Sequence, residues 1–145
     1  MKIVICASVD FTPKIKEIKD ELKRMGHDVE IPFMVKKILA GEIKLEEFLA
    51  VKEAAGDGIF REQAGEDLIL RYYNLIKEAA AILVVNCEKK GIKDYIGGNV
   101  FLEMGFAYTM DKKIFLLNPI PEMAYRDELV AMRPMIINND LSKIN

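Results

Sequence analysis

Short, uninterrupted apolar segments alternate with helical patterns along this chain, and that alternation constrains the fold more than any other feature of the sequence. Residues 2–7, 82–86 and 113–117 form runs that are too short for helices and rich in β-branched residues. Such runs are typical of strands buried on both faces. Similar, shorter patterns cover residues 29–31 and 135–138. Five strands separated by helices predict a parallel sheet with helices on both sides.

The helical segments are predicted from the spacing of their apolar residues and from their end signals. We expect the first helix to begin with Thr12 as its N-cap and Pro13 in its first turn, and to end before Gly26. The other helical patterns cover residues 34–39, 45–52, 59–81 with a bend near Gly65, 97–110 and 122–132.

This arrangement predicts a single α/β domain over residues 1–145, with a doubly wound, flavodoxin-like sheet in the strand order 2-1-3-4-5. In that order the carboxyl ends of the first and third strands lie side by side. A ligand is expected beyond these ends, where the strand order reverses. The loops that would surround it are residues 8–11, 86–98 and 118–121.

The composition excludes several classes of protein. The chain has 21 Lys and Arg against 23 Asp and Glu, a formal net charge of −2, whereas a generic nucleic-acid-binding domain is strongly basic. We find no signal-peptide pattern and no stretch near the roughly 18 apolar residues that span a bilayer. We therefore expect a cytoplasmic protein that binds neither nucleic acid nor membranes. With one histidine, His27, and two free thiols, Cys6 and Cys87, we expect no metal site or other cofactor.

Glu103 is the only charged side chain between Gly97 and Met110. A helix that is apolar nearly all round is buried, and a carboxylate inside it needs a partner or a functional reason. If Asn99 caps this helix, Glu103 lies about one turn further on, where the helix dipole would lower its pKa and keep it ionised. Such a carboxylate at the crevice is a candidate nucleophile. A structural glutamate that stabilises the helix or is paired locally is the alternative.

Further candidate binding residues lie on the loops that should surround the crevice. Gly97, Gly98 and Asn99 begin the helix, where free N–H groups bind anions and glycines let a ligand approach the backbone; a plain tight turn is the alternative. The preceding loop carries three lysines that would attract phosphate: Lys89, Lys90 and Lys93. Three more candidates follow strands: Ser8, Asn86 and Asn118. Asparagine at a strand end is, however, more often a turn residue.

Three segments match the pattern of one known family of enzymes. Residues 5–8 (ICAS) are similar to the end of that family's first strand, and residues 76–86 to its helix and third strand. Residues 98–107 (GNVFLEMGFA), followed by residues 112–114 (KKI), match its pattern Gly-x-x-x-x-Glu-x-Gly-x-Ala. The chain thus resembles the nucleoside 2-deoxyribosyltransferase-like superfamily, which includes deoxynucleoside 5′-monophosphate N-glycosidases. The resemblance covers residues 1 to about 120 and implies that Glu103 is the catalytic nucleophile.

The chain departs from the family at several accessory positions. Ala7 stands where a glycine is usual, and neither Tyr73 nor Ala81 is the aspartate expected on or after the helix before the third strand. The monophosphate glycosidases place an arginine after the first strand and a phosphate-binding serine before the glutamate helix. Here these positions are Asp10, which would repel a phosphate, and Gly97.

The resemblance implies an N-glycosidic bond hydrolase or deoxyribosyltransferase that acts on a nucleoside or nucleoside monophosphate. Glu103 would displace the base, and water or a second base would resolve the glycosyl-enzyme. The alternative is a non-catalytic nucleotide-binding or sensor module on the same fold, which fits the missing aspartate. Family members are oligomers, and the helices around residues 59–81 and 98–110 are strongly apolar. We therefore expect at least a homodimer in which they take part.

Overall fold

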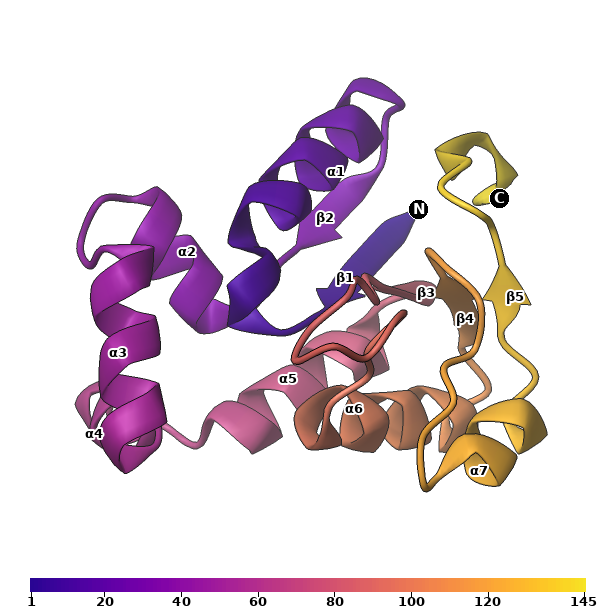
Figure 1. Cartoon of the computed structure of the whole chain (residues 1–145). Coiled ribbons are helices and arrows are strands. Elements are labelled where there is room, and N and C mark those ends of the chain that lie inside the picture. Colours follow the sequence, from indigo (N-terminus) through magenta and orange to yellow (C-terminus); the bar gives the residue numbers. More distant parts are fainter.

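The computed structural model covers residues 1–145 and shows strands and helices that alternate along the chain (Figure 1). In chain order the elements are β1 (Lys2–Cys6), the 3-10 helix η1 (Val9–Phe11), α1 (Thr12–Arg24), β2 (Asp28–Glu30), α2 (Phe33–Leu39), α3 (Leu45–Ala55), α4 (Gly58–Gln63), α5 (Leu68–Glu78), β3 (Ala81–Val84), α6 (Gly98–Thr109), β4 (Lys113–Leu116), α7 (Arg126–Ala131), β5 (Met135–Ile136) and the 3-10 helix η2 (Leu141–Lys143). None of the helices has the length and apolar character needed to cross a membrane.

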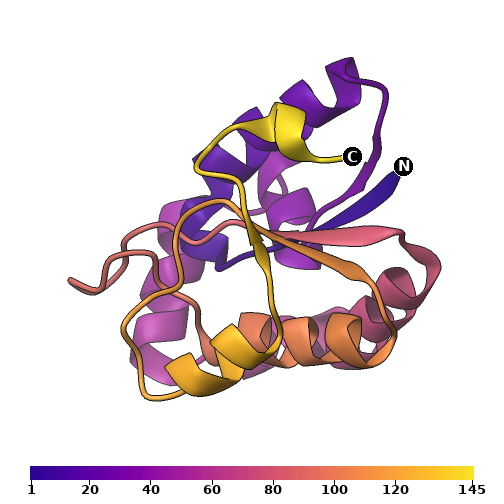
Figure 2. The same cartoon turned by 90° about the vertical axis from the view of Figure 1, so that its right-hand side faces the viewer.

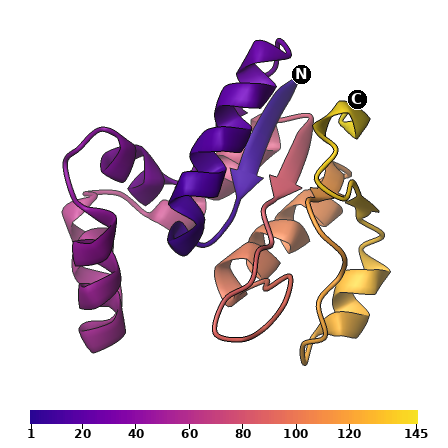
Figure 3. The same ribbon diagram turned by 45° about the horizontal axis from the view of Figure 1, so that its top comes forward.

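The five strands form one sheet in the order β2-β1-β3-β4-β5, and every neighbouring pair is parallel. The predicted fold class and strand order are therefore confirmed. Cys6 pairs with Val84, so the carboxyl ends of β1 and β3 lie side by side (Figure 3). The last strand is shorter than expected, because only Met135 and Ile136 join the sheet.

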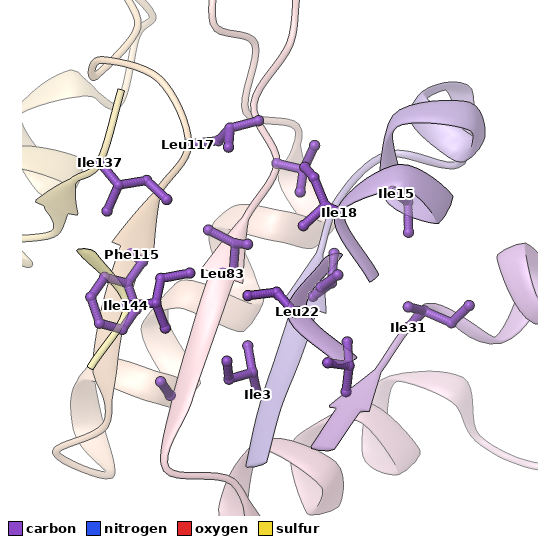
Figure 4. Close-up of a cluster of buried hydrophobic side chains, with 14 of the residues drawn as sticks. Ile3, Ile15, Ile18, Leu22, Ile31, Leu83, Phe115, Leu117, Ile137 and Ile144 are labelled. Atoms are coloured by element: carbon purple, nitrogen blue, oxygen red, sulfur yellow. The ribbon is translucent and has the colours of Figure 1, made fainter. Parts of the chain in front are cut away.

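Helices cover both faces of the sheet, with α1 and η2 on one side and α5, α6 and α7 on the other (Figure 2). Alternate residues of β1 divide between the two cores because side chains alternate across a strand. Ile3 and Ile5 pack with α1, as Figure 4 shows for Ile3, whereas Val4 and Cys6 pack with α5 and α6. All four are fully buried, as the continuous apolar run predicts for a central strand.

The connection from β1 to α1 differs from the predicted one. Thr12 is the first residue of α1 and not its N-cap. The side chain that caps a helix here is Ser8, four residues earlier, which is the N-cap of η1. The Thr12 hydroxyl donates to the carbonyl of Val9 at 2.6 Å, which stabilises this join. At the far end, Gly26 takes φ +90° just after α1, in the left-handed conformation that favours glycine.

The helices between β2 and β3 are more divided than predicted. The expected single helix over residues 59–81 is two helices, α4 and α5, separated at residues 64–67. Gly65 has φ +69° after α4, and the Asp67 side chain accepts from the N–H of Leu70 at 3.0 Å as the N-cap of α5. Helices α2, α3 and α4, residues 33–63, form a helical arm to one side of the sheet (Figure 1).

Helix α6 is buried on one face only, which corrects the expectation of a helix buried all round. Val100, Met104 and Ala107 face the core, whereas Leu102 and Tyr108 are 42% and 54% exposed. Leu102 also lines the pocket described below.

Candidate functional site

A pocket of about 300 Å³ lies beyond the carboxyl ends of β1 and β3. Residues 7–9, Lys89, Tyr95 and the first turns of α6 form one side of it. The other side comes from the helical arm and the start of α5. The pocket therefore lies at the reversal of strand order, where an open parallel sheet binds its ligands. Residues 118–121, the third predicted loop, take no part in it.

Five of the predicted site residues line this pocket: Ser8, Gly97, Gly98, Asn99 and Glu103. Gly97 precedes α6 as its N-cap residue, so the predicted cap, Asn99, is inside the first turn of the helix. The ring of Tyr95 would lie 3.2 Å from a Cβ at position 97, which leaves little room for any other residue there. Nothing obstructs a side chain at Gly98, so its backbone is open to approach.

Asn86 and Asn118 do not line the pocket, because they bind each other. The side chain of Asn86 accepts from the N–H of Asn118 at 3.0 Å and donates to its carbonyl at 3.1 Å. The side chain of Asn118 donates in return to the carbonyl of Asn86 at 2.9 Å. Asn86 is fully buried. These contacts join the ends of β3 and β4 and leave Asn86 no free group for a ligand.

Glu103 projects from the second turn of α6 into the pocket, where it is partly buried and has no ion-pair partner. Burial raises the pKa of Glu103 from 4.5 to about 8, against the lowering effects of a hydrogen bond from Cys6 and of the Arg61 charge. The expectation of a lowered pKa was wrong. The helix dipole acts mainly within the first turn of a helix. Loss of hydration, in contrast, can raise the pKa of a buried carboxyl group by several units.

Two buried side chains, Cys6 and Tyr72, lie close enough to Glu103 to respond to its charge. Cys6 ends β1 and is fully buried, and burial and the Glu103 charge both raise the pKa of its thiol well above the usual range. Tyr72 of α5 is also buried, and its hydroxyl donates to the carbonyl of Ile5. The Tyr72 hydroxyl is thus engaged by the backbone, and of these two side chains it is Cys6 that lowers the pKa of Glu103.

Aromatic side chains make up much of the remaining wall. Phe33, Phe48, Tyr95 and Phe106 line the pocket together with Tyr72. Flat aromatic faces of this kind stack well on planar groups such as nucleobases.

A polar cluster lies where β1 runs into η1. Lys89 Nζ lies 2.9 Å from both Asp10 Oδ1 and Ser8 Oγ, and the Ser8 hydroxyl donates to Asp10 at 2.8 Å. Burial favours a higher pKa for Asp10, but the hydrogen bonds from Lys89 and Ser8 outweigh it and lower the pKa. Asp10 is therefore neutralised by a lysine, and it does not by itself make the pocket repel an anion.

Sequence reasoning missed the contribution of the arm and α5. The charged residues from these segments that line the pocket are Lys52, Asp57, Arg61 and Arg71. The one signal for them was the length of the stretch 31–80 between two strands that are consecutive in the sequence, which exceeds what a simple helical crossover needs. No three His, Cys, Asp or Glu side chains come together anywhere in the chain as a metal-ligand set.

No protein-family model matches the chain, and no curated protein is similar to it in sequence. Among solved structures it is similar to the Clostridium botulinum CMP N-glycosidase BcmB, with a TM-score of 0.48 and 18% sequence identity. The alignment covers 94% of this chain and 85% of that one. At this low level of similarity, only the residues that line the pocket indicate its chemistry.

Proposed function

We propose that this chain cleaves the N-glycosidic bond of a nucleoside or nucleoside monophosphate, with Glu103 as the nucleophile. The observation that carries the proposal is a single unpaired carboxyl group, Glu103, in a pocket with aromatic walls at the reversal of strand order. The position of this carboxyl also matches the glutamate of the Gly-x-x-x-x-Glu-x-Gly-x-Ala pattern.

In this mechanism the Glu103 carboxylate attacks the anomeric carbon as the carbon–nitrogen bond breaks, and the electron pair of that bond leaves with the base. A water molecule, or a second base, then displaces the sugar from the carboxyl group. With a pKa of about 8, about a tenth of the molecules carry the ionised nucleophile at pH 7. Turnover should therefore rise with pH until Glu103 is fully ionised.

The leaving base needs a proton, and the pocket offers no second free carboxyl to supply it. Asp57 lines the pocket, but Arg61 Nε holds it at 3.0 Å. Glu103 is only partly buried, so water can reach the reacting centre and protonate the departing base. This route is less efficient than a positioned acid and predicts slow turnover.

The test is base release from a panel of nucleosides and their 5′-monophosphates, followed by chromatography. The wild type and a Glu53→Gln control, which changes an exposed glutamate outside the pocket, should release base, and Glu103→Gln should not. The value of kcat/KM should rise with pH, with its midpoint near pH 8, and level off once Glu103 is fully ionised. A fall over the same range would make Glu103 the proton donor, and normal turnover by Glu103→Gln would end the proposal.

A non-catalytic nucleotide-binding module is the second candidate function. The observation in its favour is the raised pKa of Glu103, which leaves most molecules without an ionised nucleophile at neutral pH. Such a module would be protected from thermal unfolding by members of the panel, and the wild type would release no base from any of them.

A further inference from the structure

Arg61 is the charged side chain of the helical arm that acts on Glu103. It comes from α4, on the arm side of the pocket, whereas Glu103 comes from α6 on the other side (Figure 1). Among the cationic side chains that line the pocket, it is the one whose charge lowers the pKa of Glu103. No ion pair joins the two, because the carboxylate partner of Arg61 is Asp57. The guanidinium and the carboxyl therefore line one cavity without contacting each other.

The Arg61 guanidinium is oriented by Asp57. Asp57 is the N-cap residue of α4, but its side chain makes no capping hydrogen bond. Its carboxylate instead accepts from Arg61 Nε at 3.0 Å, four residues further along the helix. Nε is the only guanidinium nitrogen of Arg61 that bonds to another group of the protein. The two Nη groups thus keep their N–H donors for a ligand.

Aromatic packing fixes the helix from which Arg61 projects. Phe60, the preceding residue, packs on Phe48 of α3 with 4.7 Å between the ring centres. Phe48 is fully buried and lines the pocket. The aromatic surface of the arm and the Arg61 guanidinium therefore belong to the same wall. We expect a planar base that binds against this wall to meet the Nη groups with its polar edge.

We propose that Arg61 is a catalytic residue that donates from its Nη groups to the departing base and stabilises the negative charge that the base acquires. The inference rests on the proposed function, because it assigns the leaving-group side of the same reaction. When the carbon–nitrogen bond breaks, its electron pair passes to the base, where the acceptor atom next to the glycosidic nitrogen shares the charge. A hydrogen bond to that acceptor is stronger in the transition state than in the bound substrate, which is what accelerates a reaction.

Arg61 is not itself the source of the proton. A guanidinium cannot be deprotonated in proteins, so Arg61 donates hydrogen bonds and stays charged throughout. The released base anion takes a proton from water. The water molecule that later displaces the sugar from Glu103 gives up a proton, so the balance closes. This role needs no second free carboxyl in the pocket.

The first test compares the pH profile of kcat/KM for Arg61→Met and the wild type, on the panel member from which base is released fastest. The midpoint should move upward, because the Arg61 charge lowers the pKa of Glu103. The plateau at full ionisation of Glu103 should fall about 100-fold, the effect of losing a donor to developing charge. A moved midpoint with an unchanged plateau would overturn the proposal.

Arg126→Met is the matched control for this comparison. Arg126 Nε lies 3.0 Å from Glu122 Oε1, four residues away, which is the same pairing as that of Arg61 and Asp57. Arg126 does not line the pocket. Its substitution should leave both the midpoint and the plateau in place.

The loss in Arg61→Met should also depend on the base. A 5-fluoro group on a pyrimidine withdraws electrons from the departing base, and a 7-methyl group on a purine lets the base leave uncharged. The second substrate is therefore the 5-fluoro or 7-methyl derivative of the base that is released fastest. For this derivative the plateau should fall by less than about tenfold. Equal losses for the parent base and its derivative would contradict the proposal.

Two further variants keep the result interpretable if Arg61→Met disturbs α4. Arg61→Lys retains the charge but not the planar set of donors, so the midpoint should stay and the plateau should fall. Asp57→Asn retains the guanidinium but weakens the bond that orients it, so the plateau should fall by a smaller factor. Plateaus at the wild-type level in both variants would contradict a role for the oriented guanidinium.

Binding of free bases separates this proposal from the proposed function. Uracil and adenine are titrated by calorimetry into Glu103→Gln, with and without Arg61→Met, which should weaken binding about tenfold. Arg61-dependent binding without base release by the wild type would support the contact to the base and contradict the glycosidase. Base release by the wild type with an unchanged plateau in Arg61→Met would do the reverse. Binding that does not depend on Arg61, without any base release, would contradict both.

Discussion

The Glu103→Gln substitution should stabilise the protein by an amount that grows with pH. In the folded chain, burial raises the pKa of Glu103 from 4.5 to about 8, whereas in the unfolded chain the carboxyl ionises near its ordinary value. Between these two pH values the unfolded state has released a proton that the folded state retains. The free energy of unfolding of the wild type therefore falls as pH rises through this window. Glutamine does not titrate and keeps nearly the same volume, so the variant escapes this loss.

Each pKa unit is equivalent to about 1.4 kcal/mol. Between pH 5 and pH 7 the full shift would cost the wild type about 2.5 kcal/mol relative to the variant. Because Glu103 keeps part of its hydration, we expect roughly 2 kcal/mol.

Urea denaturation of both proteins at several pH values measures this difference, and all other titrating groups cancel in the comparison. Glu53→Gln, at an exposed position, should show no comparable trend. A difference between Glu103→Gln and the wild type that stays constant with pH, or that shrinks as pH rises, would refute the reasoning.

Three further predictions follow from the site and the fold. Cys6→Ala removes the hydrogen bond that lowers the pKa of Glu103, so the pH profile of kcat/KM should move to higher pH, whereas Cys87→Ala should leave the profile in place. Asn86→Ala should lower the free energy of unfolding by about 2 to 3 kcal/mol in urea, since it leaves buried backbone groups of the neighbouring strand end unpaired. Because α6 exposes large apolar side chains, sedimentation at micromolar concentration should show a species heavier than one chain; a single-chain species alone would contradict the expected dimer.

The sheet could be predicted from the sequence because its central strands are short, β-branched and buried on both faces. Residues 82–86 and 113–117 are too short for buried helices, so their apolar composition predicts strands. The break between α4 and α5 was not predicted, because the helical spacing of the apolar residues continues across it. The apolar residues from Ile59 to Ala81 fit one helical stripe, and the N-cap interaction of Asp67 competes with that stripe only locally.

The part of the site that lies at the start of α6 and on the loop after β1, where Ser8 lies, could be predicted from the sequence. Glu103 and the glycines before it belong to a single helix start, so sequence spacing places them together. Lys52 reaches the pocket from the helical arm, and periodicity shows which face of a helix is apolar but not what that face meets. The raised pKa of Glu103 likewise depends on burial that the fold creates around it, with Cys6 and Tyr72 coming from distant segments.

The most direct test of the account is a search for the sugar on Glu103 itself. The wild type is mixed with the panel member from which it releases base fastest, quenched in acid within a turnover, and digested for peptide mass spectrometry. We predict that the peptide containing Glu103 carries the added mass of the sugar or sugar phosphate, and that the Glu103→Gln protein shows neither the adduct nor base release. Base release by the Glu103→Gln protein, with no adduct on the wild-type peptide, would contradict the account.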